Sequence, residues 1–171
     1  MKYARHIGYI VSIAAVLLSV ACSKINTSSV AQVMPNSRWG IAIFANNTEV
    51  PQAGYRAMNI TSGVLRSNGI ASLVTYPSKG NCNKLLVCPN ATPSLEDALR
   101  WARTKHIAYL MTGAVNEWDY KVGLDGEPIA GVSLQVYAVS SGQMVWSSVG
   151  SRIGTSRSGL AVIAQKLISE M

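Results

Sequence analysis

Three consecutive segments in the second half of the chain, residues 107–121, 128–139 and 144–152, limit the fold more than any other feature. Apolar and polar side chains alternate along much of these segments, which is typical of strands with one covered face. Turn residues at 123–126 and 140–143 separate them. Because such short connections join neighbouring antiparallel strands, we expect a three-stranded meander.

The rest of the chain alternates between short apolar runs and helical patterns. The hydroxyl of Ser94 can accept from the backbone at Asp97 and so cap one helix, and Gly69 can end another in the left-handed conformation. The expected strands are 38–44 and 71–76, and the expected helices are 53–68, 94–105 and 156–170. The order β-α-β-α-β-β-β-α predicts an α/β domain in which helices pack on a mixed five-stranded sheet, in two or three layers.

The first residues have the pattern of a bacterial secretion signal. Lys2 and Arg5 precede an apolar stretch, residues 7–20, which is shorter than the about 20 residues that a membrane span needs. Residues 18–22 (LSVAC) form a lipobox, in which signal peptidase II cuts before a diacylated cysteine. We therefore expect residues 1–21 to be a signal peptide and Cys22 to carry acyl chains such as palmitate. Ser23 follows in place of Asp, which favours sorting to the outer membrane.

The sequence after the signal divides into two parts. Residues 22–37 are polar and lack periodicity, so we interpret them as a lipidated tether, and residues 38–171 form one domain. Only 13% of all residues are charged, roughly half of the usual quarter, which suggests that a membrane or other subunits cover part of the surface. The basic residues are spread without any run of Lys or Arg, so a nucleic-acid partner is not expected.

Cys82 and Cys88 enclose five residues in a long loop. A disulfide between them is the natural state in an oxidising compartment. Free thiols and a metal site are the alternatives, but His106 is the one histidine after the signal and the chain has no Cys-x-x-Cys pair. Two cysteines and one distant histidine make a poor zinc ligand set, so no metal is expected.

The sequence predicts neither a catalytic residue nor a cofactor. A Ser-His-acid hydrolase would have to use His106, yet no Gly-x-Ser-x-Gly elbow holds a nucleophile, and no P-loop or dinucleotide fingerprint is present. Glu117, Asp119, Asp125 and Glu127 fall within eleven residues. A glycosidase could use two such carboxylates, but acids at a strand end and in a hairpin are more often simply exposed.

Three stretches resemble the PelC family, outer-membrane lipoproteins of the Pel exopolysaccharide export machinery. They are residues 101–103 (WAR), 113–128 (GAVNEWDYKVGLDGEP) and 141–147 (SGQMVWS). The resemblance extends over essentially the whole predicted domain, and the EWDYKVGLDGEP stretch is its most specific part.

The resemblance implies a non-enzymatic homo-oligomer, a dodecameric ring on the periplasmic face of the outer membrane, beneath a β-barrel exporter resembling PelB. An acidic lumen would guide a cationic amino-sugar polysaccharide to the pore, because one carboxylate repeated around a ring makes a focused negative field. Asp125 and Glu127 are the first choice for that lumen, followed by Asp119 and Glu117. Arg103 is a candidate for subunit contact.

The family also uses an aromatic residue near the membrane, where an amphipathic ring lies among the headgroups. Trp146 is available for this role, although a strand tryptophan can equally belong to the core. The segment where the resemblance leads us to expect a tryptophan has Thr155 instead. Two other functions stay open on sequence grounds: a monomeric lipoprotein adaptor that activates a cell-wall synthase, and a periplasmic hydrolase.

Overall fold

The computed structural model describes residues 23–29, 33–77, 92–121, 123 and 126–171. Cys22, Cys82, Cys88 and Asp125 lie outside these residues, so their predicted roles stay predictions. The elements follow in the order β1 (Ser23–Ser29), β2 (Trp39–Ile41), β3 (Ala45–Asn46), α2 (Ala53–Ser67), β4 (Leu73–Thr75), α3 (Leu95–Thr104), β5 (Tyr109–Tyr120), β6 (Pro128–Ala138), β7 (Gln143–Ile153) and α4 (Leu160–Glu170).

One mixed sheet organises the described part of the chain, with strand order β1-β7-β6-β5-β2-β4 and β3 beside β5. The pairs β5–β6 and β6–β7 are antiparallel, as the predicted meander requires, and β2 runs parallel to both β4 and β5. The predicted α/β class is confirmed. The sheet has seven strands where five were expected, because β1 and the short β3 add to the predicted set.

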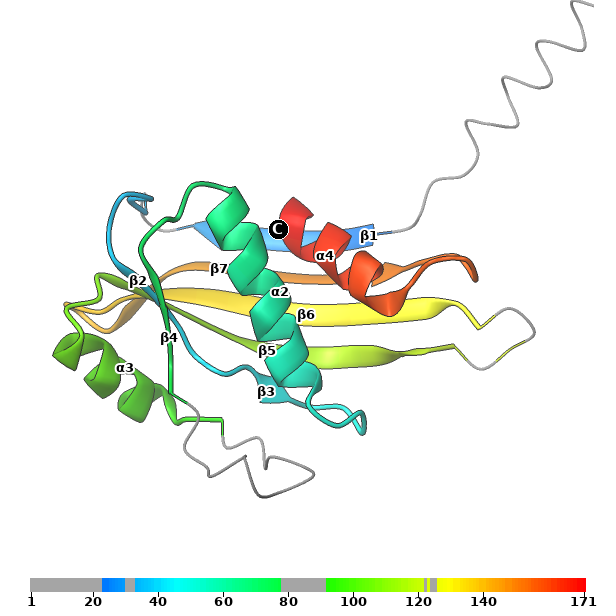
Figure 1. Ribbon diagram of the computed structural model, residues 1–171, viewed down its shortest axis with the longest axis horizontal. Coiled ribbons are helices and arrows are strands. Elements are labelled where there is room, and N and C mark those ends of the chain that lie inside the picture. Colours follow the sequence, from blue (N-terminus) through cyan, green and yellow to red (C-terminus); the bar gives the residue numbers. More distant parts are fainter. Residues whose placement is uncertain (1–22, 30–32, 78–91, 122, 124–125) are drawn as a thin grey trace, which may run out of the picture.

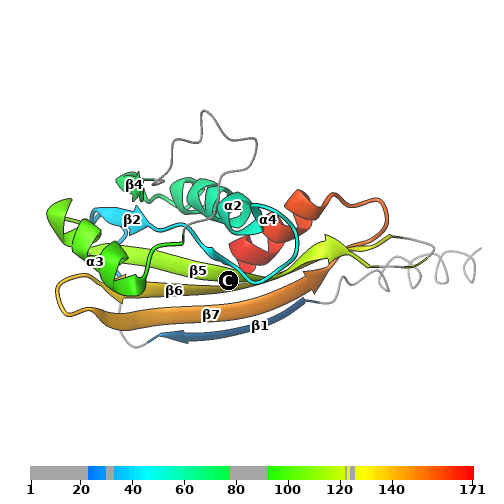
Figure 2. The ribbon, with the colours of Figure 1, turned by 90° about the horizontal axis from the view of Figure 1, so that it is seen from below.

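The helices cover the sheet unequally. Helices α2 and α4 pack side by side on one face (Figures 1 and 2), and α3 packs on β5 at one end of the sheet. Right-handed crossovers from β2 to β4 and back to β5 place α2 and α3 on opposite faces. The main core lies under α2 and α4 and includes Phe44, Ala57, Met58, Val115, Val132 and Leu167. A second cluster under α3 includes Leu99, Ala102, Ile107 and Leu110.

The tether prediction is wrong for residues 23–29, which form the edge strand β1. Each residue from Ser23 to Ser29 pairs with one residue of β7, from Arg152 back to Trp146. Only Ile25 is apolar, and its side chain lies over Gly150, where an added Cβ would be 3.1 Å from the Ile25 Cγ1. Backbone pairing can stabilise a polar edge strand that has no hydrophobic alternation to reveal it.

The last helix is shorter than predicted, beginning at Leu160 rather than at residue 156. The hydroxyls of Thr155 and Ser158 lie 3.1 Å apart, and the Ser158 amide donates to the Thr155 carbonyl, which closes a turn before the helix. Other local predictions are confirmed: Ser94 accepts from the Asp97 amide at 3.1 Å, and Gly69 has φ +92° beyond the end of α2.

One side of β1, β7, β6 and β5 faces away from α2 and α4, and we call it the open face. Its members follow from strand register and alternation. They are Lys24, Asn26, Ser28, Ser147, Val149, Ser151, Ile153, Ile129, Gly131, Ser133, Gln135, Thr112, Ala114, Glu117 and Asp119.

Two glycines of α2 provide a matched test of the packing. A Cβ at Gly54 would overlap the Phe44 carbonyl oxygen, whereas a Cβ at exposed Gly63 would meet nothing within 4 Å. Gly54→Ala should therefore lower the free energy of unfolding by about 1–3 kcal/mol through overpacking. Gly63→Ala should raise it by about 0.5–1 kcal/mol, because alanine favours the helix. Thermal unfolding of the two variants followed by circular dichroism measures both, and equal melting temperatures would contradict this packing.

Candidate functional site

Strand β1 gives the molecule a defined end. Because Ser23 pairs with Arg152, β1 begins where β7 finishes, and β5 finishes and β6 begins at the same end. Ser23, the end of β5 at Tyr120, the start of β6 at Pro128 and the loop of residues 154–159 thus lie together, toward the right in Figure 1. We call this region the Ser23 end.

Polar contacts connect Ser23, at the start of β1, to Glu170, at the end of α4. The Ser23 hydroxyl donates to Glu170 Oε2 over 3.3 Å, and the other oxygen of this carboxylate accepts from Arg152 Nη1. The Arg152 side chain is only 12% exposed, and its Nε is buried without a hydrogen-bond partner among the described residues. The pair therefore compensates a largely buried cation while it holds β1 against α4.

Glu117, a predicted lumen residue, is fixed on the open face. Its Oε2 accepts from the Ser151 hydroxyl of β7 at 2.7 Å, so the side chain reaches across β6. It does so over Gly131, where an added Cβ would be 2.9 Å from that oxygen. A register shift between Val115 and Glu117 re-aims this part of β5.

Asp119 and Glu127 lie nearer the Ser23 end. Asp119 is exposed, two residues beyond Glu117 on the same face of β5, and its Oδ1 accepts from the Tyr120 amide at 2.7 Å. Glu127 immediately precedes β6, and its carbonyl accepts from the Lys121 amide at 2.7 Å. The structure thus places Asp119 and Glu127 at the same end of the sheet as Ser23.

The other two predicted residues lie elsewhere. Arg103 is exposed on α3, and its Nη2 lies 3.8 Å from the position of a Cβ at Gly142, in the β6–β7 turn. Trp146 pairs with Ser29, six residues along β1 from Ser23, or about 20 Å at the usual strand rise. Thr155, by contrast, is exposed at the Ser23 end.

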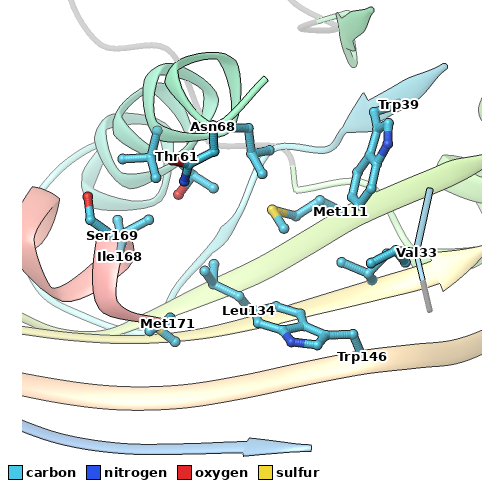
Figure 3. Close-up of a pocket in the computed structure, with 13 residues that line it drawn as sticks. Val33, Trp39, Thr61, Asn68, Met111, Leu134, Trp146, Ile168, Ser169 and Met171 are labelled. Atoms are coloured by element: carbon cyan, nitrogen blue, oxygen red, sulfur yellow. The ribbon is translucent and has the colours of Figure 1, made fainter. Parts of the chain in front are cut away.

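The Trp146 side chain lies at the edge of the main core. It packs partly buried against the main cluster and lines a cavity of about 190 Å³ between the sheet, α2 and α4 (Figure 3). Trp39, Met111 and Leu134 line the same cavity, so its walls are mainly apolar. The structure therefore favours the core interpretation of this tryptophan, and its predicted membrane role stays a prediction.

The described residues offer little for catalysis or metal binding. They contain no group of three His, Cys, Asp or Glu side chains that could hold a metal ion. His106 lies just after α3 with φ +53°, and its amide donates to the Arg103 carbonyl. No helix within the described ranges is long and apolar enough to cross a membrane.

Comparisons with known proteins supply the family. No family model and no curated protein matches the chain. A solved PelC dodecamer from Paraburkholderia phytofirmans is 36% identical, with a TM-score of 0.73, over 87% of this chain and 94% of that one. The chain belongs to the PelC family. A second dodecamer structure, of a PelC variant from the same organism, is 35% identical with the same TM-score and coverage.

More distant structures share only the fold of this PelC family member. Lipoprotein GNA1162 from Neisseria meningitidis is 11% identical with a TM-score of 0.55, over 78% of this chain and 94% of that one. The LpoB C-terminal domain from Salmonella enterica is 18% identical with a TM-score of 0.50, over 70% and 84%. The PelC resemblance predicted from the sequence is thus confirmed.

Substitution of two acids of this PelC family member tests whether Glu170 stabilises the pairing of β1 with β7. Glu170→Ala removes the partner of the Arg152 side chain, which is only 12% exposed. Amide exchange in residues 23–29 should therefore accelerate about fivefold, which corresponds to a loss of about 1 kcal/mol in the free energy of opening β1. Glu96→Ala is the control, because the ion pair of Glu96 with Arg100 is exposed and such pairs contribute little. Hydrogen exchange read by mass spectrometry measures both, and equal exchange in the two variants would show that Glu170 does not hold β1.

Proposed function

We propose that this chain is a non-enzymatic outer-membrane lipoprotein that forms a ring in the periplasm and guides a cationic exopolysaccharide to its export pore. Cys22 carries the lipid, and the partners are further copies of the chain, outer-membrane lipid and a β-barrel exporter resembling PelB. The observation that carries the proposal is the pairing of β1 with β7. It places Ser23, the residue next to Cys22, at the same end of the sheet as Asp119 and Glu127.

This arrangement orients the domain. A peptide bond joins Cys22 to Ser23, so acyl chains on Cys22 attach the protein to the membrane by its Ser23 end. Two or three acyl chains make such attachment in effect permanent, at roughly 0.8 kcal/mol for each buried methylene. The lipid supplies the anchor, and exposed Thr155 takes the place where the family resemblance leads us to expect an aromatic ring.

The same end then carries the charge that the function needs. A carboxylate at Asp119 or Glu127, repeated around a ring, forms a circle of negative charge near the membrane, and Asp125 of the same connection would add to it. Such a field attracts a polymer that carries amino groups. Glu117 already accepts a hydrogen bond from Ser151, so we rank it after the other acids as a candidate lumen residue.

The ring is favoured over the adaptor function by the relatives. The likeness to the LpoB domain shows the fold alone at 18% identity, whereas both PelC structures at 35–36% identity are dodecamers. A hydrolase finds no support in the described residues, where the acids lie on an exposed sheet end rather than in a cleft.

Neutralising the acids at the Ser23 end tests the function. Asp119→Asn combined with Glu127→Gln should reduce secreted polysaccharide at least tenfold, because the field at the pore weakens, while protein level and assembly stay normal. Glu96→Gln combined with Asp97→Asn, which removes two exposed acids of α3, should leave secretion unchanged. Immunoblots of secreted polymer measure the effect, and full secretion by the first variant would refute the lumen assignment.

Lipidation is tested by labelling with radioactive palmitate. Cys22→Ala should abolish the label and leave the precursor uncleaved, because signal peptidase II acts only before a diacylated cysteine. Cys82→Ser and Cys88→Ser should keep both label and processing. Retention of the label by Cys22→Ala would show that another residue carries the lipid.

A further inference from the structure

The open face has no covering layer in the described part of the chain. Figure 2 shows α2 and α4 above the sheet and no helix beneath β6, β7 and β1. Helix α3 contacts β5, and its cluster includes Leu110 near the start of that strand. Most of the open face along β6, β7 and β1 is therefore available to a partner.

The side chains in the middle of this face are unusually short and uncharged for a surface that meets water. Its middle consists of Asn26, Ser28, Ser133, Gln135, Ser147 and Val149, which line a shallow groove. The charged members of the face are Lys24, Glu117 and, nearest the Ser23 end, Asp119, and Glu117 is bound to Ser151. Short side chains let another layer approach closely, and depletion of charge is typical of the centre of a protein interface.

The size of the face also suits an interface. Four strands spaced ~4.8 Å apart and ~30 Å long present roughly 600 Å² in projection, and accessible area exceeds projected area. A stable interface buries about 800 Å² on each partner. The two sheet edges offer far less, because each is a single strand, of three residues in β4 and seven in β1.

We propose that the open face is covered by the outer surface of α2 and α4 of a second copy of this chain. This inference rests on the proposed ring. Contact between two different faces is what a closed ring of identical copies requires, whereas packing of the open face on itself would give only a pair.

The helical surface complements the open face. Tyr55 of α2 is 43% exposed and Val162 of α4 is 49% exposed, which supplies apolar contact. Helix α2 contains two arginines and no acid, so its charge is opposite to that of Glu117. A cationic polymer is a poorer occupant, because the middle of the open face carries no carboxylate.

Cysteine accessibility tests this surface on the full-length lipidated protein in detergent. In a chain with Cys82→Ser and Cys88→Ser, we compare Val149→Cys and Val162→Cys with the control Leu95→Cys on α3. These three side chains are 48%, 49% and 41% exposed in the single chain, so they would react alike without a partner. We expect a maleimide-polyethylene glycol probe to modify the first two at least tenfold more slowly than the control, and all three equally after denaturation.

Two failures are distinguishable by the native mass of the same sample. An oligomer in which Val149→Cys reacts as fast as Leu95→Cys overturns the assignment of the face and leaves the ring intact. A monomer overturns the proposed function itself.

A second variant keeps the natural cysteines. Val149→Lys puts a charge in the centre of the face and should reduce the oligomer to monomers with an unchanged circular dichroism spectrum. Leu95→Lys should keep the oligomer. Persistence of the oligomer in Val149→Lys would also overturn the proposal.

Discussion

The antiparallel pairing of β1 with β7 is the contact on which the functional interpretation depends. It joins the first seven residues after Cys22 to the sheet edge in one register, from Ser23 opposite Arg152 to Ser29 opposite Trp146. The ion pair between Arg152 and Glu170 and the bond from Ser23 hold that register at its start. If Cys22 carries the lipid, as we propose, a long flexible tether would leave the domain free to turn beneath the membrane, whereas this pairing fixes which end of the sheet meets it.

The meander and the helices could be predicted because their signals are local. Alternation defines β5 to β7, a hydroxyl at Ser94 begins α3, and Gly69 follows the end of α2. Strand β1 has no such signal, since it is polar on both sides apart from Ile25. Its stability comes from backbone hydrogen bonds to a strand more than a hundred residues away. Helix α4 was predicted too long at its start, because the polar residues 156–159 directly precede its apolar stripe, whereas in the structure they lie in a turn before the helix.

The candidate site could be predicted only in part, again because some of its contacts join residues far apart in the sequence. The sequence groups Glu117 and Asp119 only by their proximity along the chain, and it is the alternation along β5 that places both on one face. The bond from Ser151 to Glu117 over Gly131 depends on the register of three strands, which composition cannot reveal. Trp146 illustrates the reverse: a tryptophan in a strand suits either membrane or core, and only packing beside Trp39 and Met111 favours the core.

In the proposed account, the open face of one copy packs on the basic surface of α2 and α4 of the next, and β1 directs the acids of each copy toward the membrane. Its central claim is the ring. The most direct measurement is the native mass of the full-length lipidated protein, extracted from outer membranes in mild detergent. The account predicts one closed oligomer of about the size of its dodecameric relatives, and a stable monomer would contradict it.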